Sequence, residues 1–395
     1  MPQLQALSAI LLTSLTVLPF AAAWIHPGIL ETAADLDRMK TLVESDNEPW
    51  RTAYERFSAD KYSSSEYTLA GPFDYVSRDR DSSLSVGVSE LAEDSVAALQ
   101  TALMYSITGE NAYAEKTLDI LNAWGGTLSV VNGSDAQLAA ALSGSNLVNA
   151  AEIIRAIYPW VDEDVATFRN MVTEVLVPPA SQYTPSEEVP RPFIANWGSA
   201  GEKFMLAAAV FTEDTELYEL AKTLILESPC ANLIGSISAS GQSSETGRDQ
   251  AHTQLGLGNY VEAFITLLNQ EDATDWLSLY SNRLATGLEY TAQVLLQGDI
   301  LPPYDESFVR CNASLLGGPW SEISSDSVRP IRPIWELGYA VYADDRGVEM
   351  PYTKELIELV TPDGQSPSTA IADGSAWQTL RFRREGSELS AAITS

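Results

Sequence analysis

The sequence predicts an all-α protein whose paired helices form an incomplete barrel, or toroid, in a single domain. Long segments with apolar residues at helical spacing alternate with short turns rich in Gly, Pro or Asp. This helix–turn–helix arrangement recurs along the chain, as expected for a helical array closed into a toroid or left open as a solenoid. Segments 136–144 and 204–211 are apolar on more than one side, which favours the toroid, because its inner helices are buried all round.

The first 23 residues have the pattern of a secretory signal peptide. An apolar stretch from about Leu7 to Phe20 is followed by small residues, with cleavage expected after Ala23. Residues 24–395 then form the mature toroid domain, which we expect to be secreted and extracellular. No later apolar run reaches the roughly 18 to 20 residues that a membrane span needs, so no membrane partner is expected.

Three helical hairpins follow in order along the chain. Each consists of an apolar helical segment, a short turn and a second helical segment. One stretch at the end, Leu380–Ser395, has a strand-like pattern instead. The hairpin segments are Ser89–Ile107 with Tyr113–Trp124, Gly201–Phe211 with Leu217–Leu226, and Gly258–Gln270 with Asp275–Leu296.

Long polar loops separate these helices and are expected to border a cleft at one rim of the toroid. Binding and catalytic residues concentrate on such loops. The loops are Leu69–Ser89, Pro178–Ser199, Gly235–Thr246 and Gly298–Pro333.

Composition limits the possible partners and cofactors. A net charge of −31 argues against nucleic acid, which requires a basic surface. Two histidines far apart and scattered acids form no metal-ligand cluster, so neither a metal nor another cofactor is expected. Cys230 and Cys311 are predicted to form a disulfide in an oxidising compartment, with two free buried thiols as the alternative. Asn132 and Asn312 begin N-glycosylation sequons.

The stretch from Gly241 to Tyr260 gathers charges of both signs around one of the two histidines. Glu245, Arg248 and His252 are spaced to share one helical face, and Ser243, Ser244 or Thr246 is expected to cap that helix. A helix start at the cleft rim would favour an anionic substrate. The alternative is a surface helix with an ordinary Glu–Arg pair and a structural histidine.

Two further segments offer polar and aromatic groups. Asn196 could lend its amide to a carboxylate, or simply cap a helix, and Trp197 offers a flat face for a sugar ring. Arg332 lies among prolines before a helix with Trp335 and Tyr339, and suits either carboxylate recognition or a structural Arg–Glu network.

Several of these segments together resemble the alginate lyase superfamily of polysaccharide lyases. The resemblance rests on "SGQSSETGRDQAHTQLGLGNYVEA", "YSNRLATGLEYTAQ", "RPIWELGYAVY" and the opening "WIHPGILETAADLDRMK". It covers nearly all of the chain after the signal peptide. It implies a toroid of paired helices and cleavage of uronic-acid polymers by β-elimination.

β-Elimination requires that a base remove the C5 proton of a 4-linked uronic acid while donors neutralise the C6 carboxylate. A Tyr or His then protonates the departing O4. In the family an Asn–His pair often neutralises the carboxylate, whereas this chain has Trp197 after Asn196. The acid remains open among Tyr260, Tyr290, Tyr304 and Tyr339. The catalytic candidates are Asn196, Arg248, His252, Tyr260 and Tyr339, and the substrate-binding candidates are Trp197, Glu245, Gln250, Arg332, Trp335 and Tyr304.

The sequence therefore predicts a secreted, monomeric lyase that acts on an anionic polysaccharide of the glucuronan or alginate type. A glycoside hydrolase with paired carboxylates on a similar toroid is the second hypothesis. A secreted sugar-binding protein without catalysis is the third.

Overall fold

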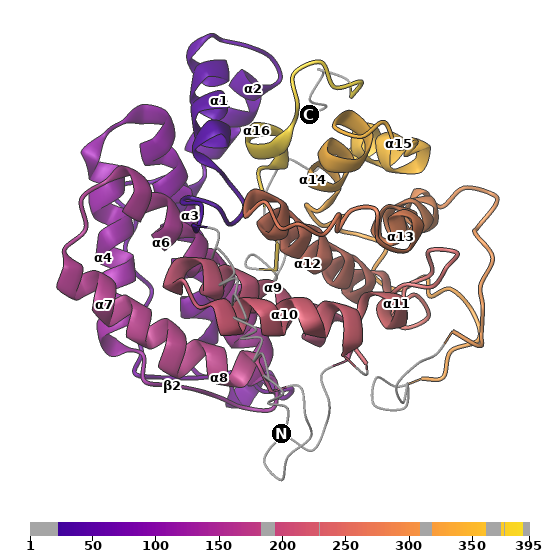
Figure 1. Ribbon diagram of the computed structural model, residues 1–395, viewed down its shortest axis with the longest axis horizontal. Coiled ribbons are helices and arrows are strands. Elements are labelled where there is room, and N and C mark those ends of the chain that lie inside the picture. The colour runs from indigo at the N-terminus through magenta and orange to yellow at the C-terminus, as the bar shows by residue number, and fades with distance from the viewer. Residues whose placement is uncertain are drawn as a thin grey trace, which may run out of the picture.

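The computed structural model describes residues 23–182, 194–228, 230–308, 318–360, 373–374 and 376–389, and within them helices form a two-layered toroid (Figure 1). Cys311 and Asn312 lie outside this part of the chain, as does nearly all of the predicted signal peptide. The disulfide with Cys230 and the second sequon therefore remain predictions. Asn132, which begins the first sequon, is exposed.

The inner layer consists of helices that are buried on almost every side. In α9 every residue except Trp197 and Thr212 is buried, as the apolar pattern of Gly201–Phe211 predicts. Each inner helix packs on the next one around the ring. The inner helices are α3 (Val88–Thr108), α6 (Gly144–Ile157), α9 (Ala195–Thr212), α12 (Gln250–Asn269) and the short α14 (Trp335–Tyr339).

The outer layer consists of amphipathic helices that bury one face against the inner ring. In α10 only Tyr218, Ala221 and Ile225 are buried, one stripe at helical spacing. Pairing of inner with outer helices confirms the predicted hairpins, although the last one contains a left-handed turn at Tyr280–Asn282. The outer helices are α4 (Asn111–Thr127), α7 (Asp162–Met171), α10 (Thr215–Glu227), α13 (Leu279–Leu296) and α15 (Pro351–Val360).

Short elements connect these layers. The only described sheet is a parallel pair in which β1 (Tyr75–Ser77) aligns with β2 (Val130–Asn132). The other helices are α1 (Ala33–Glu44), α2 (Trp50–Ser58), α5 (Ala136–Leu138), α8 (Val177–Ala180), α11 (Leu233–Ser236) and α16 (Gln378–Phe382). Single turns of 3₁₀ or π helix are η1 (Lys61–Ser63), η2 (Ser82–Leu84), η3 (Ala139–Ser143), η4 (Val172–Leu176) and η6 (Ala340–Asp344).

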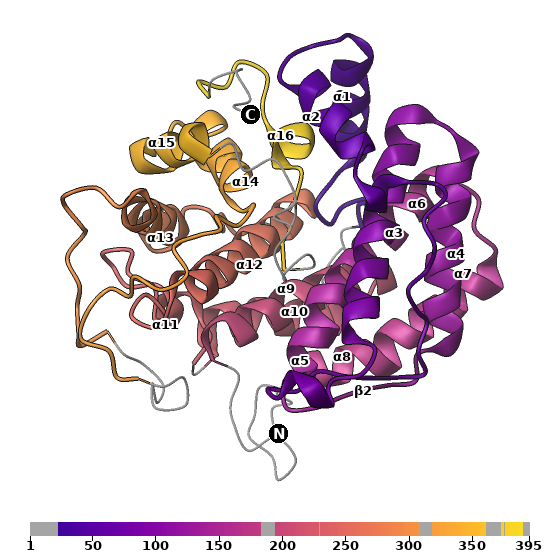
Figure 2. The ribbon, with the colours of Figure 1, turned by 180° about the vertical axis from the view of Figure 1, so that it is seen from behind.

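The two ends of the described chain meet and close the ring. Helix α16 packs against α1 and α2, and both views place these helices side by side (Figures 1 and 2). Arg38 donates to the Arg381 carbonyl over 2.6 Å, and the Arg381 Nε donates to Glu31 Oε1 over 2.6 Å. The predicted terminal strand is wrong in its described part, because Leu380–Phe382 belong to α16.

The described helices include none that is both long and apolar enough to cross a membrane. The buried apolar side chains form one continuous core from Ile29 to Leu389. This core holds the inner helices rigidly and so fixes the loops at their ends.

Candidate active site

The charged stretch before α12 is a tight turn that ends in a helix cap. Asp249 is the cap, because its Oδ1 accepts the backbone N–H of His252 over 2.8 Å. Helix α12 therefore begins only at Gln250, and Glu245 and Arg248 precede it. The predicted helical face and the predicted caps among Ser243, Ser244 and Thr246 are wrong, because the Asp249 carboxylate begins the helix later.

Asp249 also holds the two positively charged or basic side chains of the stretch. Its Oδ2 lies 2.6 Å from His252 Nδ1 and 3.6 Å from Arg248 Nε. Burial alone would raise the pKa of Asp249, but the hydrogen bonds from His252 and the charge of Arg248 outweigh it and lower that pKa. Asp249 is thus a carboxylate that fixes an arginine and an imidazole beside each other.

A second buried carboxylate ties this turn to the start of α9. Glu245 accepts Arg248 Nη1 over 3.0 Å and the Asn196 side-chain amide over 2.8 and 2.9 Å at its two oxygens. It also accepts the Asn196 backbone N–H over 3.1 Å. Both Asn196 and Glu245 are 1% exposed. The Asn196 amide N–H groups are therefore directed at Glu245 and hold it, which leaves them unavailable to a substrate carboxylate in this arrangement.

Exposure separates the groups that can reach a ligand from those that hold them. The side chains of Arg248 and His252 are 24% and 36% exposed, whereas Glu245 is buried. His252 Nδ1 is engaged by Asp249, which is the one side-chain hydrogen bond that His252 makes with the described residues. The cluster thus presents one guanidinium and one imidazole nitrogen to a ligand.

Tyr304 lies against the same turn from the long loop after α13. A Cβ added to Gly247 would stand 2.5 Å from the Tyr304 hydroxyl and 2.5 Å from Trp320 Cβ, so this close approach requires glycine. The Tyr304 hydroxyl donates to the Trp320 carbonyl over 3.3 Å. Burial, with smaller contributions from Glu306 and Asp305, raises the pKa of Tyr304.

Two buried glutamines fasten that loop to the turn. Gln242 accepts the Asp305 backbone N–H over 2.7 Å and donates to the Asp305 carbonyl over 3.1 Å. Gln250 donates to the Ser324 carbonyl over 2.8 Å and is fully buried. Gln250, predicted as a substrate contact, is a structural anchor instead, and the similar anchor Gln242 was not predicted.

Two other candidate tyrosines, Tyr260 and Tyr290, are buried and have occupied hydroxyl groups. Tyr260 is 1% exposed, and its hydroxyl bonds to Ser236 and the Ala231 carbonyl inside the core. Tyr290 is 5% exposed and donates to the Pro303 carbonyl over 3.0 Å. The assignment of Tyr260 as a catalytic residue is therefore wrong for this structure, because no ligand can reach its hydroxyl.

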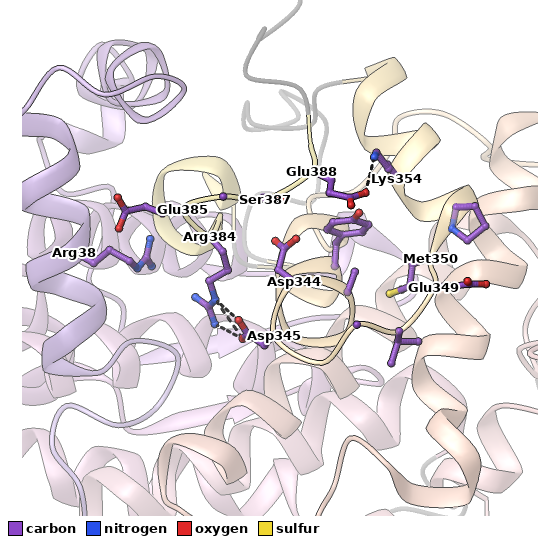
Figure 3. Close-up of a pocket in the computed structure, with 16 residues that line it drawn as sticks. Arg38, Asp344, Asp345, Glu349, Met350, Lys354, Arg384, Glu385, Ser387 and Glu388 are labelled. Atoms are coloured by element: carbon purple, nitrogen blue, oxygen red, sulfur yellow. Dashed lines mark hydrogen bonds and ion pairs between the residues drawn. The ribbon is translucent and has the colours of Figure 1, made fainter.

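Tyr339 belongs to a different part of the ring. It lines a cavity of about 840 Å³ where α1, α15 and the C-terminal segment meet (Figure 3). Arg38, Asp344, Lys354 and Arg384 line the same cavity. The catalytic assignment of Tyr339 is also wrong, because its neighbours there are those of the ring closure rather than of the turn at Arg248.

The tryptophan and the arginine that precede Tyr339 are also occupied. Trp335 is fully buried in the core, so its assignment as a sugar contact is wrong. The Arg332 guanidinium donates to Asp373 over 2.6 Å, and its backbone N–H donates to Gln254 of α12 over 2.8 Å. Arg332 therefore fits the structural alternative, an ion pair beside α12.

Trp197, next to Asn196 on α9, is partly buried. The guanidinium carbon of Arg80 lies 5.4 Å from the centre of its ring, within the range of a cation–π contact. Arg80 was missed by sequence reasoning, and only its place in the predicted rim loop Leu69–Ser89 pointed toward the cleft.

The second histidine, His26, is part of a structural network. Its Nδ1 lies 2.5 Å from the buried Glu152 of α6 and 3.0 Å from Arg155. The described residues contain no group of three or more His, Cys, Asp and Glu side chains that could hold a metal ion.

Comparisons with known proteins agree with the helical fold. The family model described as alginate lyase matches residues 44–296. An alginate lyase from Bacteroides ovatus superimposes with a TM-score of 0.56 at 15% identity, covering 91% of this chain and 100% of that one.

Alginate lyase A1-III from Sphingomonas species A1 is also similar in structure. It gives a TM-score of 0.56 at 14% identity, with 80% of this chain and 89% of that chain covered. A variant of A1-III complexed with a tetrasaccharide gives 0.61 at 14% identity, covering 89% of this chain and 95% of that chain. A comparison with curated protein sequences returned no match.

Proposed function

This chain belongs to the alginate lyase family and is a polysaccharide lyase, and we propose that it cleaves a 4-linked uronic-acid polymer by β-elimination at Arg248, His252 and Tyr304. The observation that carries the proposal is the convergence of Arg248 and His252 on Asp249, with Tyr304 against the adjoining Gly247. The family match sets aside the hydrolase and non-catalytic hypotheses.

Arg248 is assigned to neutralise the C6 carboxylate of the sugar that is cleaved. The C5 proton becomes acidic enough to remove only when that carboxylate is stabilised by donors placed in advance. Glu245 and Asp249 hold the guanidinium from two sides, so its orientation is set before substrate binds. Asn196 acts through Glu245 as a positioning residue, which changes the role predicted for it.

His252 is assigned as the base that removes the C5 proton. Asp249 accepts from Nδ1, so the neutral ring keeps its lone pair on the unpartnered Nε2. Nε2 then takes the proton from C5 as the C4–O4 bond breaks and the C4–C5 double bond forms.

Tyr304 is assigned as the acid that protonates the departing O4. It is partly exposed, and its hydroxyl lies beside Gly247, one residue before Arg248. Its raised pKa keeps the phenol protonated at neutral pH, as a proton donor requires. Tyr260, Tyr290 and Tyr339 lack this combination of exposure and position.

The expected substrate is a polymer of the glucuronan or alginate type, because either presents a carboxylate on the 4-linked sugar. We propose that the protein is secreted and acts as a monomer, with glycans at Asn132 and Asn312 and a Cys230–Cys311 disulfide, all of which rest on the sequence patterns.

The direct test is a panel of uronate polymers incubated with the purified protein. Elimination generates a C4–C5 double bond that absorbs in the ultraviolet, whereas hydrolysis generates reducing ends without it. We expect absorbance to rise with glucuronan or alginate and to stay flat with a neutral glucan. Reducing ends without absorbance on every polymer would contradict the proposal.

A further inference from the structure

The loop that precedes α3 presents an arginine with no role in the reaction described above. Arg80 has 49% of its side chain exposed in a protein with a net charge of −31. Its closest acidic partner is Asp135, at 3.8 Å from Nε, which is too long for a hydrogen bond. Its guanidinium donates no hydrogen bond to any residue that the structure describes.

The backbone around Arg80 is firmly held. Arg80 N–H donates to Ser134 Oγ over 2.9 Å, and Ser134 N–H donates to Asp79 Oδ1 over 3.0 Å. The parallel ladder between β1 and β2 fixes the two loops together just before these contacts. Arg80 therefore extends from a braced loop, and its direction does not depend on an ion pair of its own.

Trp197 supplies the platform that orients the Arg80 guanidinium. The guanidinium carbon lies 5.4 Å from the ring centre, and a guanidinium stacked on an aromatic ring keeps its in-plane N–H groups free for a carboxylate. This contact gives Trp197 a different role from the sugar platform that its sequence suggests.

Trp197 also connects Arg80 with the catalytic cluster. Its neighbour on α9, Asn196, binds Glu245, and Glu245 binds Arg248. Arg80 and Arg248 are thus attached to the same first turn of α9, one through Trp197 and the other through Asn196. Every sugar of a uronate polymer carries a carboxylate, so neutralising one at Arg248 leaves the next one to be bound.

We propose that Arg80, stacked on Trp197, is a second carboxylate-binding group that holds a uronate sugar neighbouring the one that is cleaved. The proposal rests on the proposed function for its substrate class. It assigns Arg80 to substrate binding and Trp197 to positioning Arg80, and neither takes part in the proton transfers.

The test is the kinetics of Arg80→Gln on uronate polymer. A lost charge-assisted hydrogen bond predicts a rise of about tenfold or more in KM, with kcat unchanged because the contact is the same in ground and transition states. The KM of the variant should also depend less on salt. Arg80→Lys keeps the charge but not the stacked fork, so its KM should be intermediate.

Arg51→Gln is the matched control, because Arg51 of α2 is an exposed arginine paired with Glu48 and Glu55. It removes the same charge elsewhere and should leave KM unchanged. A wild-type KM in Arg80→Gln, or an equal rise in both variants, would overturn the proposal. So would a loss of kcat with KM unchanged.

Equilibrium binding separates this proposal from the proposed function. Uronate oligosaccharide is titrated into His252→Ala and into His252→Ala/Arg80→Gln. Weaker binding by the double variant supports the subsite even if the wild type forms no unsaturated product, a result that would reject the lyase mechanism alone. Equal binding by the two variants would overturn the subsite.

Discussion

Asp249→Asn isolates the role of one oxygen atom in the site. Asp249 Oδ1 accepts the His252 backbone N–H, and Oδ2 accepts from His252 Nδ1. Asparagine has only one oxygen. If that oxygen keeps the helix cap, the amide N–H2 faces Nδ1, which must then become the acceptor and leave the ring proton on Nε2. The base would be removed without removing the histidine.

The expected loss in kcat is on the order of 10²- to 10⁴-fold, the usual contribution of a positioned acid–base group. The fold should survive, because asparagine caps helices about as well as aspartate, so the unfolding free energy should change by less than about 0.5 kcal/mol. The assay is the initial rate of ultraviolet absorbance from the unsaturated product, with thermal unfolding measured on the same samples.

Asp214→Asn is the matched control for this substitution. Asp214 caps α10 by accepting the Leu217 backbone N–H over 3.0 Å, with no catalytic candidate attached. Its asparagine variant should match the wild type in rate and stability. If Asp249→Asn also kept the wild-type rate, Asp249 would not set the protonation of His252, and the reasoning would be refuted.

The remaining predictions concern the proton donor, a buried acid and the ring closure. Tyr304→Phe should lower kcat by about 10²-fold or more. Tyr290→Phe also loses one hydrogen bond to a backbone carbonyl but should keep the wild-type kcat. Equal kcat values in the two variants would exclude Tyr304 as the acid. Burial raises the pKa of Glu202 well above its usual range. The stabilisation that depends on the protonated Glu202 is therefore complete below the unfolded pKa of about 4.3, and it decreases as the pH rises toward the pKa of the folded state. Glu202→Gln should flatten the fall in unfolding free energy over that range in pH-dependent denaturation, and an unchanged profile would argue against a buried neutral acid. Arg381→Met leaves a buried carboxylate without its partner and should lower the free energy of unfolding, measured in denaturant, by about 3–5 kcal/mol. Arg384→Met, at a partly exposed ion pair, should lower it by at most about 1 kcal/mol. Equal losses in the two variants would contradict the role given to the ring closure.

The fold could be predicted because its determinants are local. Apolar residues at helical spacing identify α3 and α9, and their burial on all sides identifies the inner layer. The end of the chain was harder to interpret. Leu380–Phe382 alternate like a strand, but they form a helix because α1 and α2 offer a helical packing surface.

The site could be predicted only where its parts are neighbours in sequence. Arg248, Asp249 and His252 lie within one turn of chain, so their proximity was visible in the sequence. The choice of Tyr304 depends on a loop that begins after α13 and folds back onto Gly247. No local pattern encodes that contact, whereas Tyr260, which is closer in sequence to Arg248, is buried.

The position at which α12 begins explains the remaining difference between the predicted and the observed site. A capping serine or threonine near position 243 would have put Glu245, Arg248 and His252 on one helical face. Asp249 caps the helix instead, so Glu245 falls in a turn where it reaches Asn196. Asn196 is therefore a support for the site rather than a donor to the substrate.

The most direct test of the account compares the only two histidines of the chain. His252 is the proposed base, whereas His26 lies in a structural network with Glu152 and Arg155. The measurement is the rate of unsaturated product formation from a uronate polymer by His252→Ala and by His26→Ala, each checked for folding. The account predicts a loss on the order of 10²-fold or more for His252→Ala and a smaller loss for His26→Ala. A His252→Ala variant at full rate, with His26→Ala inactive although folded, would contradict it.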